Sequence, residues 1–149
     1  MDELDLRIRN HVYGSFVEDG RVASPADIGA ALGIGVDAAA QSLHRLHDAH
    51  ALVLRPGSTA IRMLNPFSVV ETPHRVEAGG RTWYANCAWD ALGVPHSLHE
   101  DAARIESRCP DCGERLELEL RAGELVRGAE LLVHFVVPAR RWWDDIGFT

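Results

Sequence analysis

The residues with the clearest chemical potential are Cys87 and Asp90, which lie three positions apart beside Trp83 and Trp89. On a helix this spacing places both side chains on one face, within reach of one substrate atom. A thiolate is a soft ligand and a good nucleophile, and a carboxyl group can carry a proton. The pair therefore suits chemistry at a soft metal or an electrophilic carbon. The alternative is a buried cysteine near a helix-capping aspartate, because free cysteine is among the most buried residue types.

The other two cysteines, Cys109 and Cys112, are separated by two residues and followed by glycine. In a tight turn this spacing lets both sulfurs meet one tetrahedral ion, but a closed zinc site needs four ligands. The candidates to complete it are His96 and His99, spaced three apart, and Cys87. We therefore expect a site for Zn(II), Cu(I) or Hg(II) among these five residues. A reduced pair at a hairpin turn is the alternative, and a redox role ranks below both because strands rather than a helix start flank the pair.

The composition of the 149 residues is that of a globular protein, with 46% hydrophobic and 25% charged residues. A formal net charge of −7 argues against a constitutive nucleic-acid-binding protein, which usually has a basic face. No apolar run suggests a signal peptide or a membrane span. We expect a cytoplasmic protein with reduced thiols and with neither a membrane nor a nucleic acid as its partner.

The first part of the chain has helical periodicity. Apolar residues recur every four positions from Leu4 to Phe16, which predicts a helix over residues 4–18 that Gly20 ends. Ser24 and Pro25 begin a second helix as its cap and first residue. The pattern then predicts a third helix over residues 36–49 and a hairpin over residues 51–63.

Three helices and a hairpin in this order look like a winged helix-turn-helix over residues 1–64. The third helix offers Arg45 against Asp37 and Asp48, so it has few donors for the phosphate contacts that supply non-specific DNA affinity. A packing or lid role is therefore favoured over DNA binding, and a transcription regulator is kept as an alternative.

Beyond Asn65-Pro66 the pattern becomes that of β-structure. Residues 73–78 and 81–85 flank Gly79-Gly80 as in a hairpin. A short helix is expected over residues 86–92, ended by Gly93. The remaining expectations are strands over residues 103–108, 116–120 and 131–137 and a short helix over residues 140–145. The strand over residues 131–137 is apolar on both sides and so central or fully covered. The predicted fold class is α+β, with a helical lobe at 1–64 followed by a small mixed or antiparallel sheet domain at 65–149.

Residues 65–149 resemble the alkylmercury (organomercurial) lyase family. The resemblance rests on four stretches: Asn-Pro-Phe-Ser at 65–68, Trp-Tyr-Ala-Asn-Cys-Ala-Trp-Asp-Ala-Leu at 83–92, Ala-Arg-Ile-Glu-Ser-Arg-Cys at 103–109 and Val-His-Phe at 133–135. That family has a winged-helix-like first lobe and cleaves carbon–mercury bonds by protonolysis with two cysteines and an aspartate. The resemblance implies that Cys87 binds the metal, that Asp90 carries the proton, that the substrate is a small organometallic or thiophilic compound, and that the lyase chemistry needs no cofactor.

The sequence departs from the family at the second catalytic cysteine, which lies just before the Val-His-Phe strand. Here no cysteine occurs at that position, and Glu130 is the nearest residue to it. A carboxylate is a hard ligand and replaces a thiolate poorly on mercury, although it can serve as a general acid. The expected catalytic residues are thus Cys87, Asp90 and Glu130. A thiolate metal-binding or metal-sensing module is the alternative function.

Overall fold

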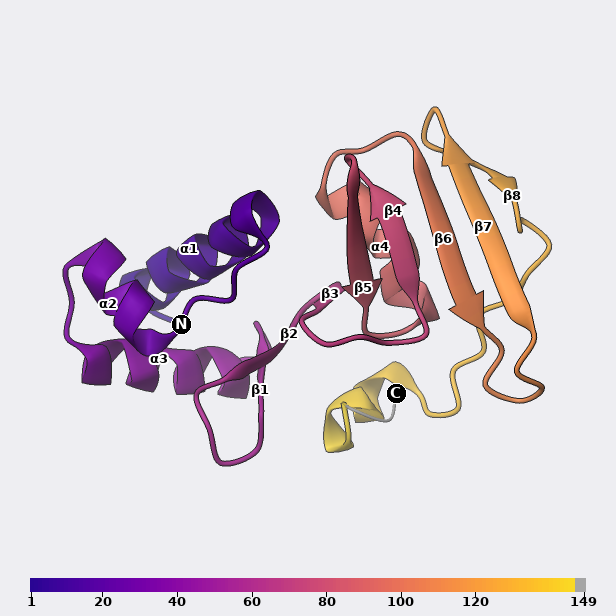
Figure 1. Cartoon of the computed structure of the whole chain (residues 1–149). Helices are drawn as coiled ribbons and strands as arrows, with labels where there is room; N and C mark the ends of the chain where they lie inside the picture. Colours follow the sequence, from indigo (N-terminus) through magenta and orange to yellow (C-terminus); the bar gives the residue numbers. More distant parts are fainter. Residues whose placement is uncertain (147–149) are drawn as a thin grey trace. The chain divides into compact units, whose positions relative to one another are not determined.

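The computed structural model describes residues 1–146, which are drawn in Figure 1. They form two compact units, Met1–Asn65 and the part of the chain from Pro66 onward. The first is mostly helical, and the second is an antiparallel sheet with an α-helix and a short 3-10 helix, so the predicted α+β class is confirmed. Among residues 1–146, no helix is both long and apolar enough to cross a membrane.

The first unit contains three helices and a two-stranded hairpin. The predicted apolar stripe is confirmed, since Ile8, Val12 and Phe16 are buried. Leu43 and Leu46 of the third helix are also fully buried. Its elements are α1 (Glu3–Asp19), α2 (Pro25–Leu32), α3 (Val36–Asp48), β1 (Val53–Leu54) and β2 (Ile61–Leu64), and β1 pairs antiparallel with β2.

Both α1 and α2 begin with a reciprocal capping arrangement. In α2 the side chain of Ser24 accepts the N–H of Asp27, and the Asp27 carboxylate accepts the N–H of Ser24. In α1, Asp2 and Asp5 make the same two bonds. Each pair satisfies two backbone donors that a helix start leaves without a partner. The predicted start of α2 at Ser24-Pro25 is confirmed.

Asp5 also joins α1 to α3. Its buried carboxylate accepts hydrogen bonds from the hydroxyl of Ser42, at 2.6 Å, and from the guanidinium of Arg45, at 2.7 Å. The hydrogen bond from Arg45 is the main reason that the pKa of Asp5 lies well below its usual value, and those from Ser42 and Asp2 act in the same direction. Asp5 therefore stays ionised in the folded protein and stabilises the contact between the two helices.

Asp5→Ala is expected to lower the free energy of unfolding of the first unit by about 2–3 kcal/mol, because Ser42 and Arg45 both lose a charge-assisted acceptor. Denaturant unfolding followed by circular dichroism measures this loss. Because folding lowers the pKa of Asp5, its contribution is present at neutral pH and declines as the pH falls below about 4. Asp27→Ala is the matched control at the same helix position, and its exposed side chain predicts a smaller loss. An equal loss in both variants would contradict this account.

Close packing at the turn between α2 and α3 requires Gly29. A Cβ at this position would lie 2.9 Å from the backbone oxygen of Ile34. Gly29→Ala is therefore expected to destabilise the first unit by about 1–3 kcal/mol. Gly14 in α1 has nothing within 4 Å of the same position, so Gly14→Ala should instead stabilise the unit, by about 0.5–1 kcal/mol. Thermal unfolding of the two variants checks both signs.

The second unit is an antiparallel sheet with the strand order β3-β5-β4-β6-β7-β8. The helix α4 packs against β4, β5 and β6 (Figure 1). Val76, Trp83, Val94 and Ile105 form the buried core between helix and sheet. The elements are β3 (Phe67–Ser68), β4 (Arg75–Ala78), β5 (Arg81–Ala85), α4 (Ala88–Ser97), β6 (Ala103–Arg108), β7 (Arg115–Arg121), β8 (Glu124–Arg127) and the 3-10 helix η1 (Ala139–Asp144).

Two expectations for the second unit are wrong. The predicted end of the helix at Gly93 is not observed, and α4 runs through Gly93 and Pro95 to Ser97. Pro95 has no N–H, so the helix loses the hydrogen bond to the carbonyl of Ala91 at this position. The next turn still forms, with the N–H of Leu98 bonded to the carbonyl of Val94.

The predicted central strand over residues 131–137 is also not formed. These residues are extended or bent outside the sheet, and Leu132 and Val136 are exposed. The apolar pattern showed that the segment can be buried, but it did not reveal that residues 1–146 provide no neighbouring strand for it. The strand β8, which was not anticipated, forms the edge of the sheet beside β7.

Candidate active site

Cys87 lies at the start of α4, two residues after the end of β5. It is the N-cap of the helix, with an extended backbone (φ −145°, ψ 177°). Its sulfur accepts the backbone N–H of Asp90 at 3.4 Å, in the way that a serine or threonine oxygen caps a helix. The first residues of α4 thus fix the thiol against the positive end of the helix dipole.

The carboxylate of Asp90 occupies the same helix position as those of Asp5 and Asp27, but its set of hydrogen-bond partners differs. All three aspartates are the third residue of their helices, and in α1 and α2 they accept the N–H of the capping residue. In α2 the carboxylate of Asp27 also accepts the hydroxyl of Ser24, at 2.6 Å. The carboxylate of Asp90 likewise accepts the side chain of its capping residue, the thiol of Cys87, at 3.5 Å between Sγ and Oδ2. The sequence predicted the proximity of Cys87 and Asp90 but not that the aspartate bonds the sulfur.

Asn86 supports the carboxylate from the other side. Its side chain hydrogen-bonds Asp90 and also donates to the carbonyl of Pro66 at 3.2 Å. Because the amide is tied to the backbone at the beginning of the second unit, Asn86 holds Asp90 in a fixed position beside the sulfur. A residue of this kind was not singled out from the sequence, although it lies directly before Cys87.

Both members of the pair are partly buried, and this determines their protonation. Burial raises the pKa of the Cys87 thiol, the charge of Asp90 raises it further, and the N–H donors of Asp90 and Trp89 lower it. Burial also raises the pKa of Asp90, against the hydrogen bonds from Cys87 and Asn86. Two neighbouring groups that both resist ionisation share protons readily. The pair can therefore hold a proton on sulfur and pass it to oxygen.

The two tryptophans near Cys87 have different surroundings. Trp83 is a core residue that donates to the carbonyl of Ala78 and packs on Phe67. Trp89 is 57% exposed and meets Phe135 edge-on at 6.3 Å between ring centroids. Phe135 in turn lies 4.8 Å from the ring of Trp142. These contacts bring the C-terminal stretch against the first turn of α4, beside Cys87.

Glu130 is exposed in the turn that follows β8. Within residues 1–146 the structure gives it no hydrogen bond or ion pair with Cys87 or Asp90. Phe135, rather than Glu130, is the residue through which this part of the chain reaches α4.

Another polar pair lies at the same end of the sheet as Cys87. The ring nitrogen Nδ1 of His74 is 2.7 Å from the hydroxyl of Ser107, which is buried at the end of β6. Burial lowers the pKa of His74, so the ring is neutral at neutral pH. This partly buried hydrogen bond is that of a packed polar side chain.

The five expected metal ligands are not gathered around one ion. His96 lies at the far end of α4, roughly 13 Å along the helix from Cys87 at 1.5 Å per residue, and His99 lies beyond it. Cys109 and Cys112 lie in the turn between β6 and β7. Among residues 1–146, no group of three or more His, Cys, Asp or Glu side chains is placed to hold a metal ion. The greater length of α4 is what separates the histidines from the thiols.

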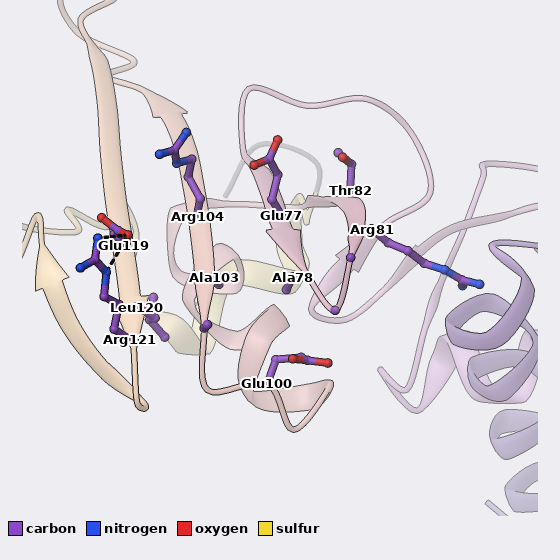
Figure 2. Close-up of a pocket in the computed structure, with 13 residues that line it drawn as sticks. Glu77, Ala78, Arg81, Thr82, Glu100, Ala103, Arg104, Glu119, Leu120 and Arg121 are labelled. Atoms are coloured by element: carbon purple, nitrogen blue, oxygen red, sulfur yellow. Dashed lines mark hydrogen bonds and ion pairs between the residues drawn. The ribbon is translucent and has the colours of Figure 1, made fainter.

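A cavity of about 840 Å³ lies at the opposite end of β5 from Cys87, around the turn between β4 and β5 (Figure 2). Glu100, Arg104 and Arg121 are among its charged lining residues, and none of the residues that line it is cysteine or histidine. Because hard charged groups line it, this cavity offers no ligand for a soft metal. The thiol and carboxylate pair lies at the start of α4, away from this cavity.

Comparisons with known proteins bear on the second unit most directly. The family model for MerB, alkylmercury lyase, matches residues 67–149. Among solved structures, a crystal structure of the mercury-bound form of MerB2 is 25% identical to this chain, with a TM-score of 0.68. The match covers 85% of this chain and 60% of that one, so the chain spans well under the full length of that relative. A comparison with curated proteins gives no match. The family model covers more than half of the sequence, and the chain therefore belongs to the alkylmercury lyase family.

Proposed function

We propose that this protein cleaves the carbon–mercury bond of a small organomercurial by protonolysis, with Cys87 binding mercury and Asp90 carrying the proton. The observation that supports this most is the hydrogen bond from the Cys87 thiol to the Asp90 carboxylate at the start of α4. It places a soft ligand and a proton acceptor side by side. Membership of the alkylmercury lyase family supports the choice of mercury.

The proposed reaction begins with an organomercurial that arrives bound to a small thiol, R–Hg–SR′. The sulfur of Cys87 displaces R′S⁻ from mercury, and the thiol proton passes along the hydrogen bond to Asp90. This step yields Cys87–S–Hg–R and a neutral carboxyl group. The raised pKa of Asp90 favours that neutral form.

In the second step the carbon–mercury bond breaks. Its electron pair leaves with carbon, which takes the proton from Asp90, so the hydrocarbon R–H departs and Cys87–S–Hg⁺ stays beside the carboxylate. R′S⁻ and a second R′SH then remove mercury as Hg(SR′)₂ and return a proton to Cys87. Mercury remains divalent throughout, so no oxidant or reductant is needed.

The small thiol of this scheme takes the place of a second protein thiol. The chain has three cysteines, and the other two lie in the turn between β6 and β7 rather than beside Asp90. Glu130 retains a proposed auxiliary role as a general acid, but its exposed position provides no support for that role. The core of the proposal is therefore the pair Cys87 and Asp90.

The direct test is to incubate the protein with a phenylmercury salt and excess free cysteine and to measure benzene by gas chromatography. We expect catalytic benzene release above a protein-free reaction that contains the same thiol. Omission of free cysteine should limit the yield to about one turnover, because mercury then stays on Cys87. Benzene formation no faster than in the protein-free reaction would refute the proposed function.

A further inference from the structure

The turn between β6 and β7 holds the remaining two cysteines in a closed conformation. Arg108 at the end of β6 pairs with Arg115 at the start of β7, and the turn lies between them. The N–H of Cys109 then bonds to the carbonyl of Glu114 at 2.8 Å, and the N–H of Gly113 bonds to the carbonyl of Cys109 at 2.9 Å. Gly113 has a positive φ of 75°, which a residue with a side chain rarely adopts. These bonds tie both ends of the Cys-x-x-Cys segment, so its two thiols have little freedom to separate.

The two-residue spacing within this closed turn keeps the two sulfurs close to each other. Hydrogen bonding by the backbone N–H of Cys112 lowers the pKa of the Cys109 thiol most. The backbone N–H of Asp111 and the thiol of Cys112 lower it further. Cys112 is exposed and Cys109 is partly exposed, so an ion from solution can reach both sulfurs.

The number of ligands decides which ions such a pair can hold. Structural Zn(II) is bound by four protein ligands, and residues 1–146 provide no third His, Cys, Asp or Glu that completes a group with this pair. Soft cations such as Hg(II) and Cu(I) select thiolates and are satisfied by two of them. A dithiol without further ligands therefore favours these ions over zinc.

The pair also lies apart from Cys87. The register of β5, β4 and β6 places the end of β5 and the end of β6 at the same end of the sheet, with β4 between them. Two strand spacings separate β5 from β6, which is about 10 Å. All three thiols thus lie at one end of the second unit, but the turn is too far from Cys87 for the three to share one ion.

We propose that Cys109 and Cys112 form a second metal site, which binds one soft cation such as Hg(II) through both sulfurs and without Cys87. Because this site does not use Asp90, its existence is independent of the proposed lyase reaction. The chain would then hold one soft-metal site for chemistry and a separate one for binding alone.

The test uses inorganic Hg(II) and the full chain, kept reduced with a phosphine that adds no thiol. Each variant is mixed with excess Hg(II), challenged with free cysteine, passed through a desalting column and weighed by native mass spectrometry. Cys87→Ser should retain one mercury ion per chain under this challenge. Adding Cys112→Ser to that variant should abolish retention, because a single thiolate cannot compete with an excess of monothiol. Zn(II) should not be retained by either.

Three results would overturn the proposal: no mercury on Cys87→Ser, unchanged retention after Cys112→Ser is added, or stoichiometric retention of zinc. Circular dichroism shows whether the variants fold. A second measurement needs no variant: one equivalent of Hg(II) should protect Cys109 and Cys112 together from iodoacetamide in the wild-type chain, as mapped by peptide mass spectrometry. Because neither assay measures carbon–mercury cleavage, a failed benzene assay leaves both results interpretable.

Discussion

Cys87→Ser is expected to reduce benzene release from phenylmercury to the protein-free rate. A serine hydroxyl is a hard oxygen ligand that stays protonated at neutral pH, so it neither displaces a thiolate from mercury nor weakens the carbon–mercury bond. Gas chromatography of benzene with wild-type and variant protein at equal concentration measures the effect.

Serine is also the best-matched replacement for judging this result. It is among the preferred N-cap residues, and Ser24 already caps α2 in this chain with an aspartate three residues later. The start of α4 should therefore survive in Cys87→Ser, and the thermal unfolding midpoint should be close to that of the wild type. A variant that retains more than about a tenth of the wild-type rate, a barrier change of under 1.4 kcal/mol, would contradict the role of Cys87.

Asp90→Asn is expected to lower the catalytic rate by about 10²–10⁴-fold, the usual contribution of a positioned general acid. The amide has nearly the shape of the carboxylate but carries no transferable proton. Cys87 remains available, so the variant should still form a phenylmercury adduct of Cys87. Intact-protein mass spectrometry measures that adduct, and benzene release measures the cleavage step.

The pH profile separates proton transfer from a structural role. In the mercury-bound enzyme Asp90 must be neutral when the carbon departs, so kcat should fall as the pH rises through the pKa of Asp90, which burial raises above its usual value. This decline should be absent in Asp90→Asn. An identical pH profile in both proteins, or loss of the adduct together with the cleavage, would rule out Asp90 as the proton carrier.

Local signals predicted the first unit well because most of its structure is decided within a few residues. Ser24 with Asp27, Gly20 and Gly33 set helix ends through hydrogen bonds and left-handed backbone that involve only their neighbours. The buried contact of Asp5 with Arg45 could not be predicted in this way. It joins residues 40 positions apart, and nothing in the pattern of α1 distinguishes Asp5 from a capping residue.

In the second unit the errors arise where tertiary packing overrides local preference. Gly93 and Pro95 normally end a helix, but α4 packs against the strands β3, β4, β5 and β6 and buries Val94 and Pro95. Gly93 takes part in this packing, and a Cβ at this position would meet the side chain of Pro66 at 3.4 Å, an ordinary van der Waals distance. Residues 131–137 show the opposite error, since a strand needs a partner that its own sequence does not specify.

The candidate site shows the same limit. The spacing of Cys87 and Asp90 could be read from the sequence, and the resemblance to alkylmercury lyases gave these residues their expected roles. The hydrogen bond from thiol to carboxylate depends in addition on Asn86, which holds Asp90 by way of Pro66. The expected metal cluster wrongly included two histidines. The sequence placed His96 and His99 after the end of the helix, but α4 continues through His96 and so carries both histidines away from the thiols.

Two helix starts of this chain, those of α2 and α4, suggest how a pair of this kind can arise. The start of α2 has Ser24 with Asp27, and the start of α4 has Cys87 with Asp90, so the two differ at the cap by an oxygen and a sulfur. With oxygen in an exposed position, the aspartate accepts both the backbone N–H and the hydroxyl of the capping residue. With sulfur in a partly buried position, the aspartate accepts the thiol of the capping residue and is also held by Asn86. An ordinary helix cap thus differs by one atom type at the capping residue from the proposed mercury-binding pair, and evolution or design can move between the two without building a new backbone.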